Sequence, residues 1–248
     1  MKIHFVCTNS IVEKEVIREL KPNNLLLSYA YFKNKRLKDF VDEIGYTPNI
    51  LLDSGAYTAF SKGKNISLID YMRYIDENAP YIGRYITLDV IGNPRITRKF
   101  YEIMKMENYN PVPVYHYGDD IKYLQRYVDS GETYIALGKT VPITDKSKVA
   151  AWVNELADQF PTIKFHLLGS SSRKVTAGTN LYSVDSSTWI MQAINGYPKE
   201  IGGKTREAKK KRALWQMSEH MTREGDLNGK TEAASSFTGT KEQTQKIS

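Results

Sequence analysis

Short apolar runs rich in β-branched and aromatic residues alternate along the chain with longer segments whose apolar residues recur every three or four positions. The first pattern is typical of strands and the second of amphipathic helices, so their alternation predicts βα units around a parallel sheet. Ser67, for example, precedes one helical segment and is predicted to cap it. The predicted strands are residues 2–6, 24–29, 49–53, 84–89, 111–115, 133–137, 163–168 and 181–185.

Eight strands with helices between them predict an α/β fold, a (β/α)8 TIM barrel that occupies residues 1–197. An open, doubly wound sheet is the alternative topology. Residues 198–225 carry a dense basic run, and we expect them to form a basic helix packed on the barrel, from about Lys204 to about Arg223. Residues 226–248 are polar and small and have no period, which predicts a flexible tail.

Composition narrows the classes of function. The chain has 248 residues and a net charge of +7, which is compatible with a polyanionic partner. Cys7 is the single cysteine, so no disulfide within the chain and no thiolate zinc site is expected, and a reducing compartment is indicated. The apolar N-terminal stretch is too short for a signal peptide, and no run approaches the roughly 20 apolar residues of a membrane span. We therefore expect a cytoplasmic protein without membrane association.

Polar residues and glycines follow the predicted strands at the point where each strand ends. In parallel α/β folds, functional groups collect at these carboxyl ends. Taken singly, each residue has an ordinary structural explanation, because aspartates cap helices and glycines make turns. The recurrence of an acid followed by serine after the third and eighth strands instead predicts one shared pocket. The residues on this rim are Asp53, Ser54, Gly55, Asp89, His116, Gly138, Gly169, Asp185 and Ser186.

Four motifs carry a resemblance to a known family. "DSGAYTAF" (residues 53–60) and "YSVDSSTW" (residues 182–189) resemble the two aspartate motifs of the tRNA-guanine transglycosylase superfamily. "ALGKT" and "HLLGSS" resemble the two glycine turns that lie between those motifs, and the match spans roughly residues 45 to 195. The resemblance implies a (β/α)8 barrel and a pentosyltransferase that replaces guanine in nucleic acid by a 7-deazaguanine base through a covalent aspartyl-sugar intermediate.

The resemblance also implies roles for individual residues. Asp185 matches the nucleophile and Asp53 the general acid/base near the sugar, the arrangement of two carboxyl groups that a retaining glycosidase uses. Tyr57 matches the aromatic residue that stacks on the base, and Asp89 the acid that binds the base edge. The rest of the base pocket would be formed by His116, Gly138, Leu168 and Gly169, and the loops near the sugar by Ser54, Gly55 and Ser186.

Two departures from the family pattern point to a branch of it. The Cys-x-Cys-x-x-Cys zinc subdomain of the tRNA enzymes is missing, and His116 stands where the bacterial enzymes place a glutamine. The chain looks closest to short, zinc-free phage relatives that place 7-deazaguanines into DNA, which would put it in the host cytoplasm. The resemblance thus implies that DNA is the substrate, and tRNA is the alternative. It also implies a free 7-deazaguanine such as preQ0 as co-substrate and no cofactor. A homodimer or a helper subunit is left open.

Basic residues are candidates for contact with the nucleic-acid backbone, although a lysine run is usually a solvated face. These candidates are Lys62, Lys64, Arg173, Lys174, Lys204, Arg206, Lys209, Lys210, Lys211 and Arg212. Three other functions remain open at this point. They are a hydrolase that releases a base without replacing it, a barrel that binds nucleic acid without turnover, and a barrel that acts on a phosphorylated metabolite through the "GSSS" turn at residues 169–172.

Overall fold

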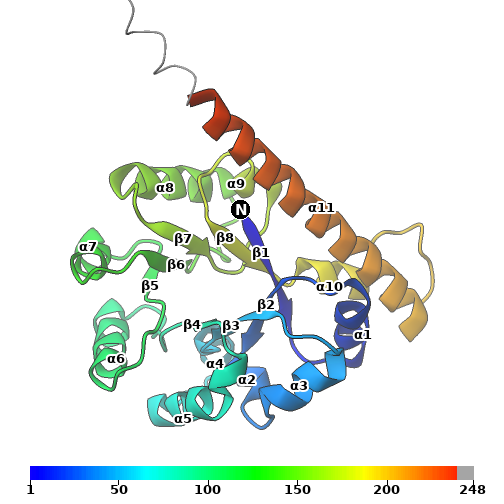
Figure 1. The fold of residues 1–248 in the computed structure, drawn as a ribbon, viewed down its shortest axis with the longest axis horizontal. Coiled ribbons are helices and arrows are strands. Elements are labelled where there is room, and N and C mark those ends of the chain that lie inside the picture. Colours follow the sequence, from blue (N-terminus) through cyan, green and yellow to red (C-terminus); the bar gives the residue numbers. More distant parts are fainter. Residues whose placement is uncertain (239–248) are drawn as a thin grey trace, which may run out of the picture.

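All eight predicted strands form, and they lie parallel in one sheet in the order β4-β3-β2-β1-β8-β7-β6-β5. The computed structural model describes residues 1–238 (Figure 1). Each observed strand overlaps its prediction, and β4 is the shortest. The strands are β1 Lys2–Cys7, β2 Asn24–Ser28, β3 Asn49–Asp53, β4 Arg84–Tyr85, β5 Val114–His116, β6 Tyr134–Gly138, β7 Lys164–Leu167 and β8 Ser183–Ser186.

The two ends of this sheet meet between β4 and β5. A single bridge joins Ile86 to Val112 in parallel orientation. The amide of Val112 donates to the carbonyl of Tyr85 at 2.8 Å, and the amide of Thr87 donates to the carbonyl of Val112 at 2.9 Å. This contact closes the sheet into a barrel, so the predicted (β/α)8 fold is confirmed and the open sheet is excluded. Strands β4 and β5, which flank this seam, are shorter than predicted.

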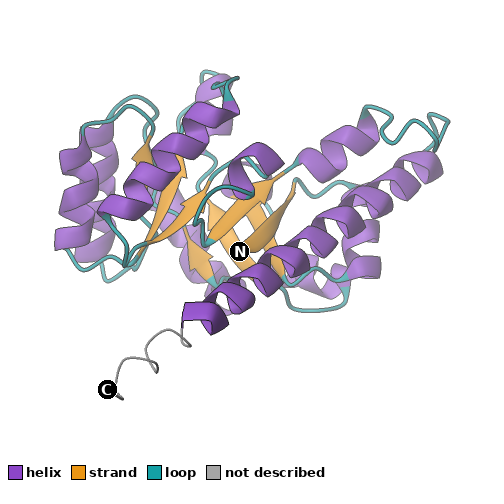
Figure 2. Cartoon of the chain, turned by 90° about the horizontal axis from the view of Figure 1, so that it is seen from above, coloured by secondary structure: helices purple, strands orange, loops and turns teal. Residues whose placement is uncertain are grey.

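Helices surround the strands on the outside of the barrel (Figure 2). Ser67 caps its helix as predicted, since its side chain accepts from the amide of Asp70. A short 3-10 helix, Ala79–Tyr81, follows that capped helix. The α-helices are α1 Ile11–Leu20, α2 Tyr29–Phe32, α3 Leu37–Ile44, α4 Ala56–Ser61, α5 Leu68–Asn78, α6 Pro94–Met106, α7 Ile121–Asp129, α8 Lys146–Gln159, α9 Arg173–Thr176, α10 Thr188–Ile194 and α11 Arg206–Thr238.

Two cores result from the alternation of side chains along the strands. In β3, Ile50 and Leu52 pack outward against the helices, whereas Leu51 packs into the barrel. The inner core is small and consists of side chains that point into the barrel. Its buried members are Leu26, Leu51, Ile86, Val112, Val114, Tyr134 and Ala136.

Helix α11 lies across the outside of the barrel, next to α1 and α10 (Figure 1). Ala213 and Met217 are buried in the outer core, and the ring of His220 packs against Phe5 of β1 with centroids 6.4 Å apart. The helix continues to Thr238, so residues 226–238 are helical where a flexible tail was expected, and residues 239–248 of that expected tail lie outside the described residues. No helix in the described part of the chain is long and apolar enough to span a membrane.

Candidate functional site at the carboxyl end of the barrel

Three carboxyl groups from different strands gather at the carboxyl end of the barrel. Asp53 ends β3, Asp89 follows β4, and Asp185 lies in β8. Burial, together with the negative charges of Asp89 and Asp185, raises the pKa of Asp53 to about 7. Asp53 and Asp185, 132 positions apart in the chain, both lie at the carboxyl ends of parallel strands, which open on one rim of the barrel. The structure thus brings the two predicted catalytic acids together.

The carboxyl group of Asp53 is held by its own loop. The amide of Gly55 donates to Asp53 Oδ2 at 2.9 Å. Gly55 adopts a φ of +79°, and a Cβ on it would lie 2.6 Å from the Cβ of Ala30. Only glycine fits this position, because both the backbone conformation and the close approach exclude a side chain. Gly55 therefore lets the chain turn back after β3, so that its amide can bind the carboxyl group of Asp53.

Asp185 is anchored through one oxygen. Its Oδ1 accepts from the amide of Gly169 at 2.9 Å and lies 3.2 Å from His166 Nε2. The other ring nitrogen of His166 lies 2.8 Å from Ser183 Oγ, which lies 2.9 Å from the hydroxyl of Tyr134. Asp185 Oδ2 makes no hydrogen bond among the described residues. The arrangement fixes the carboxylate and leaves one oxygen available to react.

His4 packs against this buried chain of polar groups. Its ring meets that of His166 edge-on, with centroids 5.3 Å apart. Burial, followed by the proximity of His166, lowers the pKa of His4 to about 3, so its ring is neutral at physiological pH. With His166 Nε2 protonated, His166 donates to Asp185, and the hydroxyls of Ser183 and Tyr134 can donate in sequence toward Nδ1.

Asp89 and His116 form a buried ion pair. His116 Nε2 lies 2.9 Å from Asp89 Oδ2, and Ser54 Oγ donates to Asp89 Oδ1 at 3.2 Å. His116 Nδ1 lies 3.7 Å from a carboxylate oxygen of Asp119. Burial lowers the pKa of His116, but the interactions with Asp119 and Asp89 outweigh it and raise the pKa to about 9. The contact with His116 fixes the orientation of Asp89.

Gly138 makes room for this histidine. A Cβ on Gly138 would lie 2.6 Å from His116 Cδ2 and 3.1 Å from Nε2. Gly169 has a φ of +74° and uses its amide to bind Asp185. Both predicted glycines therefore lie at the site, and each has a separate physical reason to lack a side chain.

Tyr57, Leu168 and Ser186, the remaining predicted site residues, differ in exposure and in their contacts. Tyr57, in α4, is 53% exposed. Leu168 is half-buried against the inner core. Ser186 Oγ donates to Thr188 Oγ1 at 2.7 Å and accepts from the Thr188 amide, so it stabilises the start of α10.

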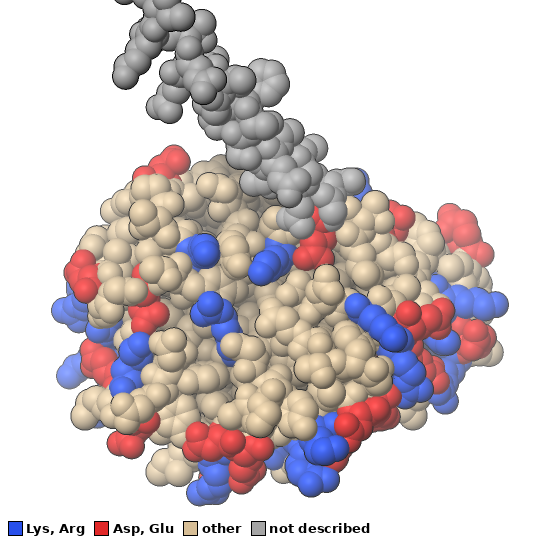
Figure 3. Space-filling model, viewed as in Figure 1, with Lys and Arg blue, Asp and Glu red and all other residues tan. Residues whose placement is uncertain are grey.

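Part of the basic run at the start of α11 is used within the molecule. Arg206 pairs with Glu15, and Lys210 pairs with Glu19 at 3.0 Å. Basic and acidic side chains accordingly lie side by side where α1 meets α11, on the right of Figure 3. Lys62, Lys64, Arg173, Lys174, Lys204 and Lys211 are exposed, and Lys209 is half-buried.

Arg212 is not a nucleic-acid contact. Its side chain is buried, and its guanidinium donates to the carbonyls of Ala193 at 2.7 Å, Ile201 at 2.7 Å and Gly203 at 3.0 Å. It closes the connection between α10 and α11. The sequence prediction was wrong here because a run of basic residues on a helix gives no sign of which member faces inward.

A groove that the sequence analysis missed lies next to the acids. It has a volume of about 660 Å³ and is enclosed by α11, α10 and the loops that follow β6 and β7. Gly169, whose amide binds Asp185, belongs to its wall, and so does Thr188. Trp215 and Tyr197 line it with exposed rings. In the sequence these residues stand apart, and no local pattern marks them as one groove.

Among the described residues, no group of three or more His, Cys, Asp or Glu side chains is arranged to hold a metal ion. No protein-family model and no curated protein matches the chain. Solved structures do match. The chain is similar to the YdjI aldolase from Escherichia coli K12, with 15% identity over 91% of this chain and 90% of that one, at a TM-score of 0.54.

It is also similar to a mutant tryptophan synthase alpha-subunit from the hyperthermophile Pyrococcus furiosus. That match has 15% identity over 87% of this chain and 97% of the other, at a TM-score of 0.50. At such low identity, both similarities concern the fold alone. They agree with the closed sheet described above: this chain is a (β/α)8 barrel.

Proposed function

We propose that the protein is a guanine transglycosylase that acts on nucleic acid, with Asp185 as nucleophile and Asp53 as general acid/base. The observation that carries this proposal is the pairing of two unlike carboxyl groups at one rim. Asp185 Oδ1 accepts a hydrogen bond from the Gly169 amide, whereas Asp53 has a pKa raised to about 7 by burial and its acidic neighbours. Two acids in contrasting environments can divide the roles of nucleophile and proton donor.

The first half of the reaction breaks the glycosidic bond. A carboxylate oxygen of Asp185 attacks C1′ of the nucleotide, and the electron pair of the C1′–N9 bond leaves with guanine. Protonated Asp53 supplies the proton that the departing base takes up. The product is an aspartyl-sugar ester, and Asp53 is left as a carboxylate.

The second half restores both acids. The Asp53 carboxylate removes the N9 proton of an incoming 7-deazaguanine, whose nitrogen attacks C1′. The bond between C1′ and the Asp185 oxygen breaks, and its electrons return to the carboxylate. Two displacements at the same carbon retain the configuration of the sugar.

Recognition of the base is assigned to Asp89. Its carboxylate can accept hydrogen bonds from the guanine N1–H and exocyclic amine, which adenine does not offer in that arrangement. The ion pair with His116 and the bond from Ser54 fix its orientation before the base arrives. The exposed ring of Tyr57 is assigned to stacking on a base that has left the helix, an interaction worth roughly 1–3 kcal/mol. DNA is the proposed polymer, on the motif resemblance, and tRNA is the alternative.

Mass spectrometry of nucleosides tests the proposal. DNA and tRNA are each incubated with the protein and a free 7-deazaguanine, and the digested nucleosides are analysed. We expect the 7-deazaguanine nucleoside to appear in DNA and guanine to be released in equal amount. Release of guanine without incorporation would replace exchange by hydrolysis.

Asp185→Asn is the decisive variant. It should form no covalent adduct and exchange no base, while Asp158→Asn, at an exposed position on α8, should behave as wild type. Full exchange by Asp185→Asn would refute the assignment.

A further inference from the structure

We propose that the groove between α11 and the loop after β7 binds the nucleic-acid strand next to the reacting nucleotide, with Arg173 and Arg223 on a phosphate and Trp215 stacked on the neighbouring base. This inference rests on the proposed function for the identity of the strand. It assigns the strand's path to residues of α9 and α11, which lie outside the motifs of the rim. We call this space the α11 groove; it is lined by Lys146, Gly169, Ser170, Arg173, Thr188, Tyr197, Trp215, Glu219 and Arg223, among others.

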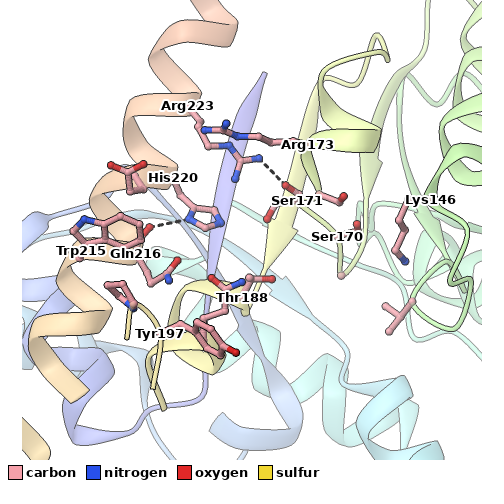
Figure 4. A pocket seen from close by; sticks show the side chains of 16 residues that line it. Lys146, Ser170, Ser171, Arg173, Thr188, Tyr197, Trp215, Gln216, His220 and Arg223 are labelled. Atoms are coloured by element: carbon pink, nitrogen blue, oxygen red, sulfur yellow. Dashed lines mark hydrogen bonds between the residues drawn. The ribbon is translucent and has the colours of Figure 1, made fainter. Parts of the chain in front are cut away.

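The α11 groove carries more positive than negative side chains. Arg173 and Arg223 lie next to each other on the wall of the groove (Figure 4). Burial and the adjacent Arg173 lower the pKa of Arg223, which is the electrostatic sign of two crowded cations. With Lys146, the groove holds three cations against the single carboxylate of Glu219.

The two guanidiniums have few partners of their own. Arg223 donates to the carbonyl of Ser171 at 2.7 Å, which fixes its position without neutralising it. The guanidinium of Arg173 makes no hydrogen bond or ion pair among the described residues. Two adjacent guanidiniums without a paired carboxylate favour a phosphate, because a phosphate oxygen pair can accept from both.

Aromatic rings are the second argument. The side chains of Trp215 and Tyr197 line the groove and are 46% and 49% exposed. Bases stack on exposed aromatic rings irrespective of sequence, so these two rings can hold a base. The volume of about 660 Å³ is within the range of pockets that hold small ligands, so one nucleotide can enter it.

The α11 groove is connected to Asp185 through residues that line it. The Gly169 amide binds Asp185 Oδ1, and Gly169 itself lines the groove. Thr188, also in the wall, is bonded to Ser186, the residue after Asp185. A strand whose sugar lies at Asp185 therefore passes directly into the groove with its next phosphate and base.

Binding of a fluorescent, unpaired guanine-containing oligodeoxynucleotide tests this inference. Affinity is measured by anisotropy over a series of salt concentrations, in the catalytically silent Asp185→Asn protein and in the same protein with a groove substitution. Arg173→Gln should weaken binding and reduce the slope of log K against log salt by about 1, as expected for one lost phosphate contact. Trp215→Ala should weaken binding roughly 5- to 150-fold without changing that slope.

The control is Arg126→Gln, which removes an exposed arginine from α7, a helix that does not line the groove. It should match the parent protein in both affinity and slope. Because Arg173 and Trp215 are exposed, both groove variants should unfold at the temperature of the parent, and circular dichroism checks this.

Unchanged affinity and slope in both groove variants would overturn the inference and leave the transglycosylase proposal intact. A second result would also overturn the inference. In it, the oligonucleotide does not bind, but inorganic phosphate or a phosphorylated sugar binds and loses affinity in Arg173→Gln. If the groove variants behave as expected but wild type exchanges no base, the proposed function fails and the strand site stands.

Discussion

His116 Nε2 lies 2.9 Å from Asp89 Oδ2 inside the rim of the barrel, and the two form a buried ion pair. Residues from successive strands thereby place a positive charge among three carboxyl groups. This charge orients Asp89 and offsets part of the repulsion between the acids. The pair also ties His116 to Asp89, the acid to which base recognition is assigned.

The pH dependence of stability tests this ion pair. The folded-state pKa of His116, about 9, is above its usual value of 6.5, so folding is favoured by a bound proton. The stabilisation is complete below about pH 6.5 and is lost as the pH rises through 9. The difference between the two pKa values limits its contribution to the free energy of unfolding to about 3 kcal/mol. Relative to His116→Gln, wild type should lose free energy of unfolding between pH 7 and pH 10 in urea titrations. Parallel curves for the two proteins would contradict the raised pKa.

The raised pKa of Asp53 makes a separate prediction for activity. As general acid, Asp53 must be protonated, so guanine release should fall as the pH rises through about 7. Asp89→Asn removes one of the charges that raise this pKa, so the descending limb should move to lower pH. Single-turnover release of labelled guanine measures both. If the pH at which guanine release falls is the same in Asp89→Asn as in wild type, Asp89 does not raise the pKa of Asp53.

Asp53 should also lower stability at high pH. A folded pKa raised from 3.8 to about 7 gives a contribution that is favourable at acid pH and is lost as the pH rises between these values. Asp53→Asn removes that penalty, so it should increase the free energy of unfolding at pH 8 relative to wild type, and more so than at pH 4. Denaturation in urea at the two pH values provides the comparison, with exposed Asp158→Asn as the matched control.

His166 is predicted to position Asp185. Replacement by asparagine removes the contact at Asp185 Oδ1 and the link to Ser183 but keeps a polar side chain. We expect kcat to fall by roughly 10- to 100-fold with little change in KM, because a misplaced nucleophile reacts slowly even when substrate is bound. Ser183→Ala should act through the same chain, so the double variant should be no worse than the poorer single one. Additive losses would indicate two independent structural defects.

Arg212 should contribute to stability and not to binding. Arg212→Met deprives the carbonyls of Ala193, Ile201 and Gly203 of their donor, and we expect a loss of about 2–4 kcal/mol of unfolding free energy. Lys211→Met, at the exposed neighbouring position, should be close to neutral. In salt titrations with DNA, the folded Arg212→Met protein should keep the wild-type slope. A reduced slope would return Arg212 to the list of phosphate contacts.

Local patterns in the sequence were sufficient for the strands and for the rim. The period of two in β3 places Leu51 inward and carries Asp53 to the end of the strand, and both features can be read without any distant contact. The rule that polar groups at the carboxyl ends of parallel strands face one opening then brings Asp53 and Asp185 together. These predictions succeeded because each depends on short-range spacing and on one general property of the fold.

Tertiary structure alone decided the partners of these residues. Nothing in the order of the chain pairs His116 with Asp89 or His166 with Asp185, because each contact depends on the angle and register at which neighbouring strands pack. The same holds for Arg212, whose helix face is buried only because α11 lies against α10, and for the α11 groove, whose walls come from four separate segments. Side-chain spacing specifies which residues can face a core, whereas the packing of whole elements determines what each of them meets there.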